Sequence, residues 1–167
     1  KRKQKFLQRY EQLTGLFSKT SGSRNKTVLG VYEGWNGVRL AMQEILKAER
    51  GTELLIYSVF IPDNILPKFR RFIKPFHEKR SEKGIECKLL LTENMRSTLG
   101  KDRRNNASTQ VKFVPLEQPT STVFNVYKDK TLIIIWSDSP LAIIIQNKEL
   151  AESFKTKFNF LWKTARK

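Results

Sequence analysis

The stretch Glu-Leu-Leu-Ile-Tyr-Ser-Val-Phe, residues 53–60, decides the fold class because it predicts a strand between two helical segments. Its aliphatic and aromatic side chains favour a strand. Apolar residues at helical spacing precede it over 38–49, and a second helical segment follows it over 64–83. Two more strands are predicted outside these helices, at 27–32 and 85–91. This alternation predicts a parallel sheet with right-handed crossovers and helices on its faces.

The pattern changes in the second half of the chain. Residues 92–98 predict the start of a short helix, and the polar, basic segment 100–109 predicts a mobile loop. A short strand is expected at 111–115. Three strand runs separated by tight turns then predict an antiparallel meander, at 121–127, 131–136 and 141–146. The expected fold is therefore α/β, with a parallel first half and an antiparallel second half.

Two finer expectations concern single elements. Leu132 to Trp136 is apolar throughout, which predicts a central strand buried on both faces. Pro75 lies inside the second helical segment and predicts that the helix is kinked or divided there. A last helix is expected from about Asn147, a good N-terminal cap, to Thr164.

The composition limits the possible functions of the chain. Its 167 residues carry 32 Lys and Arg against 16 Asp and Glu, a formal net charge of +16. This charge points to phosphate-bearing partners, namely nucleic acid, an anionic membrane surface or a phosphorylated small molecule. The alternative is a lysine-rich solvated surface. With one Cys and one His, the sequence offers no disulfide framework, and no metal site or cofactor is expected. No apolar run is long enough for a membrane span, and we expect a cytoplasmic protein.

Residues 1–26 form a separate basic segment before the main domain, which we place at 27–167. The first residue is Lys, so we expect a piece of a longer protein. A polar stretch around Ser21 predicts a linker between the two parts. The preceding apolar residues have the spacing of a helix that packs on a partner, and they are the candidate dimer-interface residues: Phe6, Tyr10, Leu13 and Phe17. This stripe is covered either by the domain itself, by a second copy or by sequence that precedes it.

Nothing in the sequence predicts a catalytic residue. His77 and Lys79 form a His-x-Lys pair like that of the phospholipase D superfamily, but Gly84 stands where the pattern needs Asp. Cys87 lies in an apolar strand and is expected to be a buried small residue. The candidates for nucleic-acid contact are instead basic residues in the second helical segment and the polar loop: Arg70, Arg71, Lys101, Arg103 and Arg104.

The chain resembles one protein family in the order of its motifs. The motifs are Tyr32-Glu33-Gly34-x-x-Gly37, Phe76-His77-x-x-Arg80-x-x-x-Gly84-Ile85, the closing segment from Pro140 through Gln146-Asn147 to Phe154, and Phe158-x-x-Leu161-Trp162. Over residues 27–167 they resemble the C-terminal domain of TrmB-type transcriptional regulators of the phospholipase D-like variety. The resemblance implies a phospholipase D-like fold, a linker helix that supports dimerisation, and a winged helix-turn-helix that precedes this segment and binds DNA.

The first hypothesis is therefore a non-catalytic regulatory and dimerisation domain of a DNA-binding transcriptional regulator, acting as a homodimer. A small-molecule effector pocket is expected at the carboxyl ends of the first three strands, with four candidate residues: Glu33, Trp35, Tyr57 and Arg80. The second hypothesis is a phospholipase D-like module that binds nucleic acid directly, including a degenerate nuclease. The third is an interaction domain whose basic surface is only solvated.

Overall fold

The computed structural model describes residues 27–104, 106, 108–115 and 120–167. The predicted N-terminal helix, with Phe6, Tyr10, Leu13 and Phe17, lies outside these residues. The strands are β1 (Val28–Glu33), β2 (Glu53–Val59), β3 (Glu86–Thr92), β4 (Thr109–Val114), β5 (Thr122–Tyr127), β6 (Lys130–Ile135) and β7 (Leu141–Gln146). The helices are α2 (Gly34–Ile45), α3 (Leu66–Glu82), α4 (Lys101–Arg104) and α5 (Lys148–Thr164). A 3₁₀ turn η1 (Glu93–Met95) and a π-helical turn η2 (Arg96–Gly100) precede α4.

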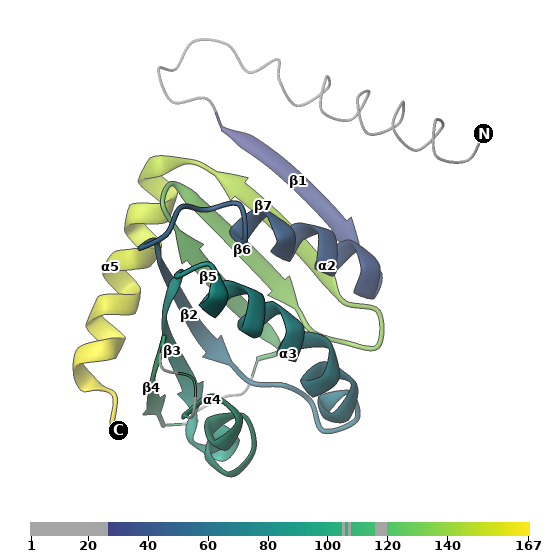
Figure 1. Ribbon diagram of the computed structural model, residues 1–167, viewed down its shortest axis with the longest axis vertical. Coiled ribbons are helices and arrows are strands. Elements are labelled where there is room, and N and C mark those ends of the chain that lie inside the picture. Colours follow the sequence, from purple (N-terminus) through teal and green to yellow (C-terminus); the bar gives the residue numbers. More distant parts are fainter. Residues whose placement is uncertain (1–26, 105, 107, 116–119) are drawn as a thin grey trace.

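The described strands form one mixed sheet in the order β1-β7-β6-β5-β2-β3-β4 (Figure 1). Strands β2, β3 and β4 are parallel, and β5, β6 and β7 form the predicted antiparallel meander. The predicted α/β class is confirmed. Strand β1 differs in one respect, because it pairs with β7 and not with β2. It runs parallel to β2, but the whole meander lies between the two strands. The alternation of strands and helices predicts that the strands run in the same direction, but it does not determine which strands are neighbours.

The helices divide between the two faces of the sheet. Helices α2 and α3 cover one face and bury the larger core, which includes Ile45, Leu89 and Trp136. Helix α5 packs on the other face through Phe158, which is fully buried. The expected cap is present at its start, where the Asn147 side chain accepts a hydrogen bond from the Leu150 amide at 3.0 Å.

Two sequence expectations about helices are wrong in part: α3 is not divided at Pro75, and residues 101–104 are helical. Helix α3 runs undivided through Pro75, which lies on the exposed side of the helix, where water can bond the carbonyl left without a donor. The segment expected as a mobile loop begins with α4, because the Asp102 side chain pairs with Arg70 of α3 and the Arg103 side chain is buried. The polar composition of this segment concealed these contacts.

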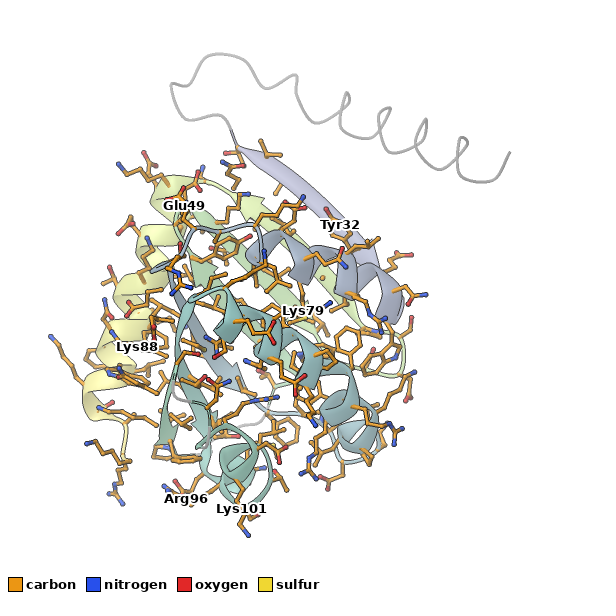
Figure 2. The ribbon with its side chains drawn as sticks, viewed as in Figure 1. Tyr32, Glu49, Lys79, Lys88, Arg96 and Lys101 are labelled. Atoms are coloured by element: carbon orange, nitrogen blue, oxygen red, sulfur yellow. The ribbon has the colours of Figure 1, made fainter. Side chains whose placement is uncertain are left out.

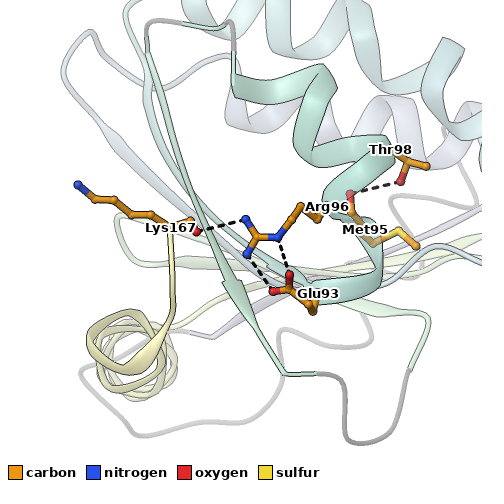
Figure 3. Close-up of polar contacts among 5 residues, drawn as sticks. All are labelled: Glu93, Met95, Arg96, Thr98 and Lys167. Carbon is orange, nitrogen blue, oxygen red and sulfur yellow. Dashed lines mark hydrogen bonds and ion pairs between the residues drawn. The ribbon is translucent and has the colours of Figure 1, made fainter.

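The start of η2 is held by Arg96 (Figure 3). The Arg96 guanidinium donates to both carboxylate oxygens of Glu93, at 2.5 and 3.0 Å, and to the Lys167 carbonyl at 3.2 Å. It also lies 3.8 Å from the centroid of the Phe113 ring on β4. Next to it, Arg166 exchanges two backbone hydrogen bonds with Phe113. These contacts hold residues 166 and 167 against β4 and the start of η2.

Strand β6 is buried on one face and half-exposed on the other, so the expectation of burial on both faces is wrong. Leu132 and Ile134 are at most 1% exposed under α2 and α3, whereas Ile135 is 38% exposed. Helix α5 crosses the opposite face diagonally and leaves part of it uncovered. We call this part the open sheet half. It consists of seven aliphatic residues on β1, β7 and β6 that share one face and are at least partly exposed: Leu29, Val31, Ile133, Ile135, Leu141, Ile143 and Ile145.

Within the described residues, no helix is both long enough and apolar enough to cross a membrane.

Candidate nucleic-acid interface

A cationic cleft of about 200 Å³ lies between α2 and α3 on the outer surface of the molecule. Its lining consists of Arg39, Met42, Gln43, Leu46, Arg71, Phe72, Pro75, Phe76 and Lys79. No carboxylate belongs to this lining. Three of the residues are exposed cations, and within the part of the chain that the structure describes none of them has an ion pair. We call these three residues, Arg39, Arg71 and Lys79, the cleft cations; Figure 2 labels Lys79 on α3.

Helical spacing builds this cleft. Arg39 and Gln43 are one turn apart on α2, and Arg71 and Lys79 are two turns apart on α3, so each pair lies on one side of its helix. Phe76 is buried below them in the core. The Arg39 guanidinium lies 5.2 Å from the centroid of the Phe72 ring of α3, a cation–π contact that holds it over the cleft. The cleft therefore offers positive charges above an apolar floor.

Of the three cleft cations, only Arg71 is among the residues that the sequence indicated as candidates for nucleic-acid contact. Arg39 is the sole cation in α2, and a count of charge density along the chain does not find it. A signal existed, because the sequence predicted both helices on the same face of one sheet. The outward positions of neighbouring helices could therefore have been compared.

The other candidate contact residues have different environments. Arg70 forms a two-point ion pair with Asp102, with N–O distances of 2.7 and 2.8 Å, so a carboxylate already satisfies its guanidinium. Lys101 is exposed on α4 (Figure 2). Arg103 is only 8% exposed and lies behind α3. The side chain of Arg104 lies outside the described part of the structure.

Behind α3, two arginines surround the single histidine of the chain. Arg80 is fully buried and donates hydrogen bonds to the Thr109 hydroxyl at 2.6 Å, to the Ser108 carbonyl at 3.3 Å and to the Ile85 carbonyl. It thereby joins the end of α3 to the starts of β3 and β4. Burial, together with the positive charges of Arg103 and Arg80, lowers the pKa of His77 well below its usual value. His77 is therefore a neutral, buried ring at physiological pH.

The four effector-pocket candidates do not line one common pocket, so the prediction that they act together is wrong. Trp35 packs against Phe72 and Trp136 on the α2–α3 face, and its indole N–H donates to the Asp138 carbonyl at 2.9 Å. Tyr57 is fully buried on the opposite face, stacked on Phe124 under α5.

The other two candidates lie elsewhere again. Glu33 is exposed at the end of β1, which the meander separates from β2. Arg80 is a structural residue at the far end of α3. The sequence could not predict that these residues lie apart, because it does not show that three strands separate β1 from β2.

The described residues hold no cluster of His, Cys, Asp and Glu able to bind a metal ion. Cys87 is buried in β3, and burial raises the pKa of its thiol to about 11, so the thiol stays protonated.

No family model and no curated protein matches this sequence. Among solved structures, the chain is similar over 99% of its length to TrmBL2, an archaeal chromatin protein whose structure is described as showing a novel mode of DNA binding (TM-score 0.51, 18% identity). It covers 62% of that chain.

Two further similar structures are those of proteins named Nuc and NucT. Nuc from Salmonella typhimurium, a phospholipase D family member, has a TM-score of 0.60 at 16% identity, with 84% of this chain and 97% of that chain covered. NucT from Helicobacter pylori has a TM-score of 0.57 at 13% identity, with 84% and 98% covered. The chain has a phospholipase D-like fold, and the resemblance to TrmB-type regulators is confirmed at the level of the fold.

Proposed function

We propose that this chain is a non-catalytic regulatory and dimerisation domain of a cytoplasmic DNA-binding transcriptional regulator, and that the cationic cleft contacts DNA phosphates. The observation that carries the DNA contact is the convergence of Arg39, Arg71 and Lys79 around a cleft lined by no carboxylate. Phosphate contacts by Arg and Lys provide the sequence-independent part of DNA affinity and position a protein on the duplex. The likeness to TrmBL2, which binds DNA, supports the same role.

The absence of catalysis is proposed from the environment of His77. A nucleophilic or acid–base histidine needs access to substrate and a pKa near the working pH. His77 is 5% exposed, and two guanidinium groups disfavour its charged form. Incubation of the chain with single- and double-stranded DNA tests this proposal. No phosphodiester cleavage is expected, and cleavage that disappears in His77→Ala would favour the degenerate nuclease instead.

Dimerisation is proposed from the open sheet half. Val31 is 61% exposed and Leu29 is 39% exposed, and aliphatic residues on β7 and β6 extend this surface. Among the described residues of these three strands, the one charged side chain on the same face is Glu33, at the edge of the patch beside Leu141. Contiguous apolar patches of this kind mark protein interfaces. A second copy suits the patch, because an isologous contact brings together the same surface of both copies, and this mainly aliphatic surface carries none of the Lys and Arg residues that give the chain its charge of +16. Sedimentation velocity is expected to show a dimer at micromolar concentration, and a monomer would contradict this proposal.

The DNA proposal is tested by fluorescence anisotropy with a labelled random duplex across salt concentrations. The triple variant Arg39→Gln, Arg71→Gln, Lys79→Gln is expected to lower the slope of log K against log salt by about 3, because each lost phosphate contact removes about 0.9. The matched control changes three exposed lysines of α5 that have no described ion pair, Lys148→Gln, Lys157→Gln and Lys163→Gln. Equal loss of slope in both variants would show that only net charge matters.

A further inference from the structure

A second depression, the α3–α4 groove, lies on the other side of α3 from the cationic cleft. Its volume is about 720 Å³, within the size range of small-molecule sites. Its lining consists of Arg70, Arg71, Lys74, His77, Glu78, Ser81, Glu82, Asp102, Arg103 and Asn106. Arg103 and His77 form the buried part of this lining, at 8% and 5% exposure.

Arg103 carries a charge that the described residues offset only in part, through the nearby carboxylate of Asp102. No hydrogen bond or ion pair to its guanidinium is present among them, and the adjacent carboxylate of Asp102 is already held at two points by Arg70. Burial and the nearby charges of Arg80 and Arg70 lower the pKa of Arg103. An arginine nevertheless stays protonated, so its donors are left without a hydrogen-bond acceptor among the described residues. Leaving such a charge buried and unpaired is costly, and an anion would remove that cost.

His77 adds a second donor to the buried part of the groove. Its Nδ1 accepts a long hydrogen bond of 3.5 Å from the Arg80 Nε. The proton of the neutral ring is therefore on Nε2. A guanidinium fork and an imidazole N–H together match the oxygens of a phosphate group.

The charges at the rim restrict the size of the ligand. Glu78, Glu82 and Asp102 belong to the same lining, unlike the cationic cleft, where no carboxylate is present. A polyanion lying along the groove would be repelled by these carboxylates. A single phosphate group paired with Arg103 would not have to approach them. Their oxygens and the Ser81 hydroxyl can accept hydrogen bonds from hydroxyl groups on the rest of a small ligand.

We infer that the α3–α4 groove is a binding site for a small phosphate monoester, whose phosphate pairs with the Arg103 guanidinium. The groove shares Arg71 of its rim with the cationic cleft, but the inference does not rest on the proposed DNA contact. In the proposed regulatory domain it would supply an effector site, away from the carboxyl ends of the strands where the sequence placed one.

The probes are inorganic phosphate and glycerol 3-phosphate, measured by isothermal titration calorimetry at constant ionic strength with chloride as the reference anion. Wild-type protein is expected to bind both phosphate probes. Arg103→Met should bind them at least tenfold more weakly, because it removes the one guanidinium that is both buried and unpaired among the described residues. Lys101→Met removes the same charge from an exposed position of the same helix and should leave the affinity unchanged. Absence of binding to wild type, or equal affinity in Arg103→Met, would overturn the inference.

Thermal unfolding separates a ligand site from a purely structural arginine. Without phosphate, Arg103→Met should unfold at the same temperature as wild type or above it, since an apolar side chain replaces an unpaired charge. With saturating phosphate the order should reverse, because only wild type gains stability from the ligand. A variant that is less stable under both conditions by the same amount would contradict the site.

Two further measurements keep the inference testable. Arg103→Lys keeps the charge and is expected to fold, but its ammonium cannot form the fork, so phosphate affinity should fall several-fold. An unchanged affinity would argue against Arg103. The second measurement uses duplex DNA. The double variant Arg39→Gln, Lys79→Gln should weaken DNA binding and leave phosphate binding unchanged. If Arg103→Met weakens DNA binding as much as phosphate binding, the groove holds DNA phosphates and the small-ligand inference is wrong.

Discussion

The two faces of the sheet are covered to different extents, although the same strands supply both. In β6, Leu132 and Ile134 point toward α2 and α3 and are almost completely buried, while Ile133 and Ile135 point the other way and stay partly exposed. The residue types on the two sides are the same. The difference therefore comes from what packs on the strand, not from the strand itself.

This contrast is the basis for proposing a different partner for each face. The helices of the covered face present cations to solvent, which suits a phosphate backbone, and they bury Arg80 and His77 beneath them. The open sheet half presents aliphatic side chains, which suit another protein surface. Along one row of paired residues, exposure falls from 61% at Val31 to 0% at Tyr57 as α5 begins to cover the sheet.

The largest expected effect concerns the sheet face opposite α2 and α3, in the part that α5 covers. Phe158→Ala should lower the free energy of unfolding by about 3–5 kcal/mol, because a fully buried ring is removed from its contacts with Tyr57 and Trp162. Phe160 is 69% exposed on the same helix, so Phe160→Ala is the matched control, with a change within about 0.5 kcal/mol. Urea denaturation measures both. Similar losses in the two variants would mean that α5 does not pack as described.

The second largest effect is expected in the open sheet half. Val31→Asp places a charge in the open sheet half and should weaken the dimer roughly hundredfold, about 2.7 kcal/mol of association free energy. Leu40 is 50% exposed on α2, on the opposite face, so Leu40→Asp should leave association unchanged. Analytical ultracentrifugation over a concentration series gives both dissociation constants. A dimer that tolerates Val31→Asp but not Leu40→Asp would show that the dimer forms through the α2 side and not through the open sheet half.

The smallest effect concerns the buried histidine of the covered face. The pKa of His77 is lowered in the folded state, so below about pH 6.5 only the unfolded chain takes up this proton. Stability should therefore fall as the pH falls from 7 to 5.5, with a slope that approaches about 1.4 kcal/mol per pH unit. His77→Gln should remove this slope. The measurement is urea denaturation at several pH values, and an unchanged slope in the variant would place the titration elsewhere.

The sequence predicted those parts of the fold that depend on local patterns. The strand at 53–60 and the helix ending near Gly84 follow from side-chain spacing and from a residue that tolerates positive φ, 70° here. The position of β1 beside β7 depends on contacts between residues more than 100 apart in sequence, which periodicity does not contain.

The same distinction holds for the candidate sites. Arg70, Arg71 and Arg103 look alike as sequence, yet Arg70 is paired with Asp102, Arg71 is exposed at the cleft, and Arg103 is buried with no hydrogen-bond or ion-pair partner in the described part of the chain. Charge counting locates a basic segment, whereas burial and pairing decide which cations remain available. Both properties arise only when α3 and α4 come together.

The most direct test of the central claim is a map of the DNA contact on the folded chain. In a ¹H–¹⁵N spectrum titrated with a short random duplex at low salt, the largest shift changes are expected on α2 and α3 around Arg39, Arg71 and Lys79, and they should shrink as salt is added. Changes concentrated on α5 or on β1 and β7, with the α2–α3 cleft unaffected, would contradict the account.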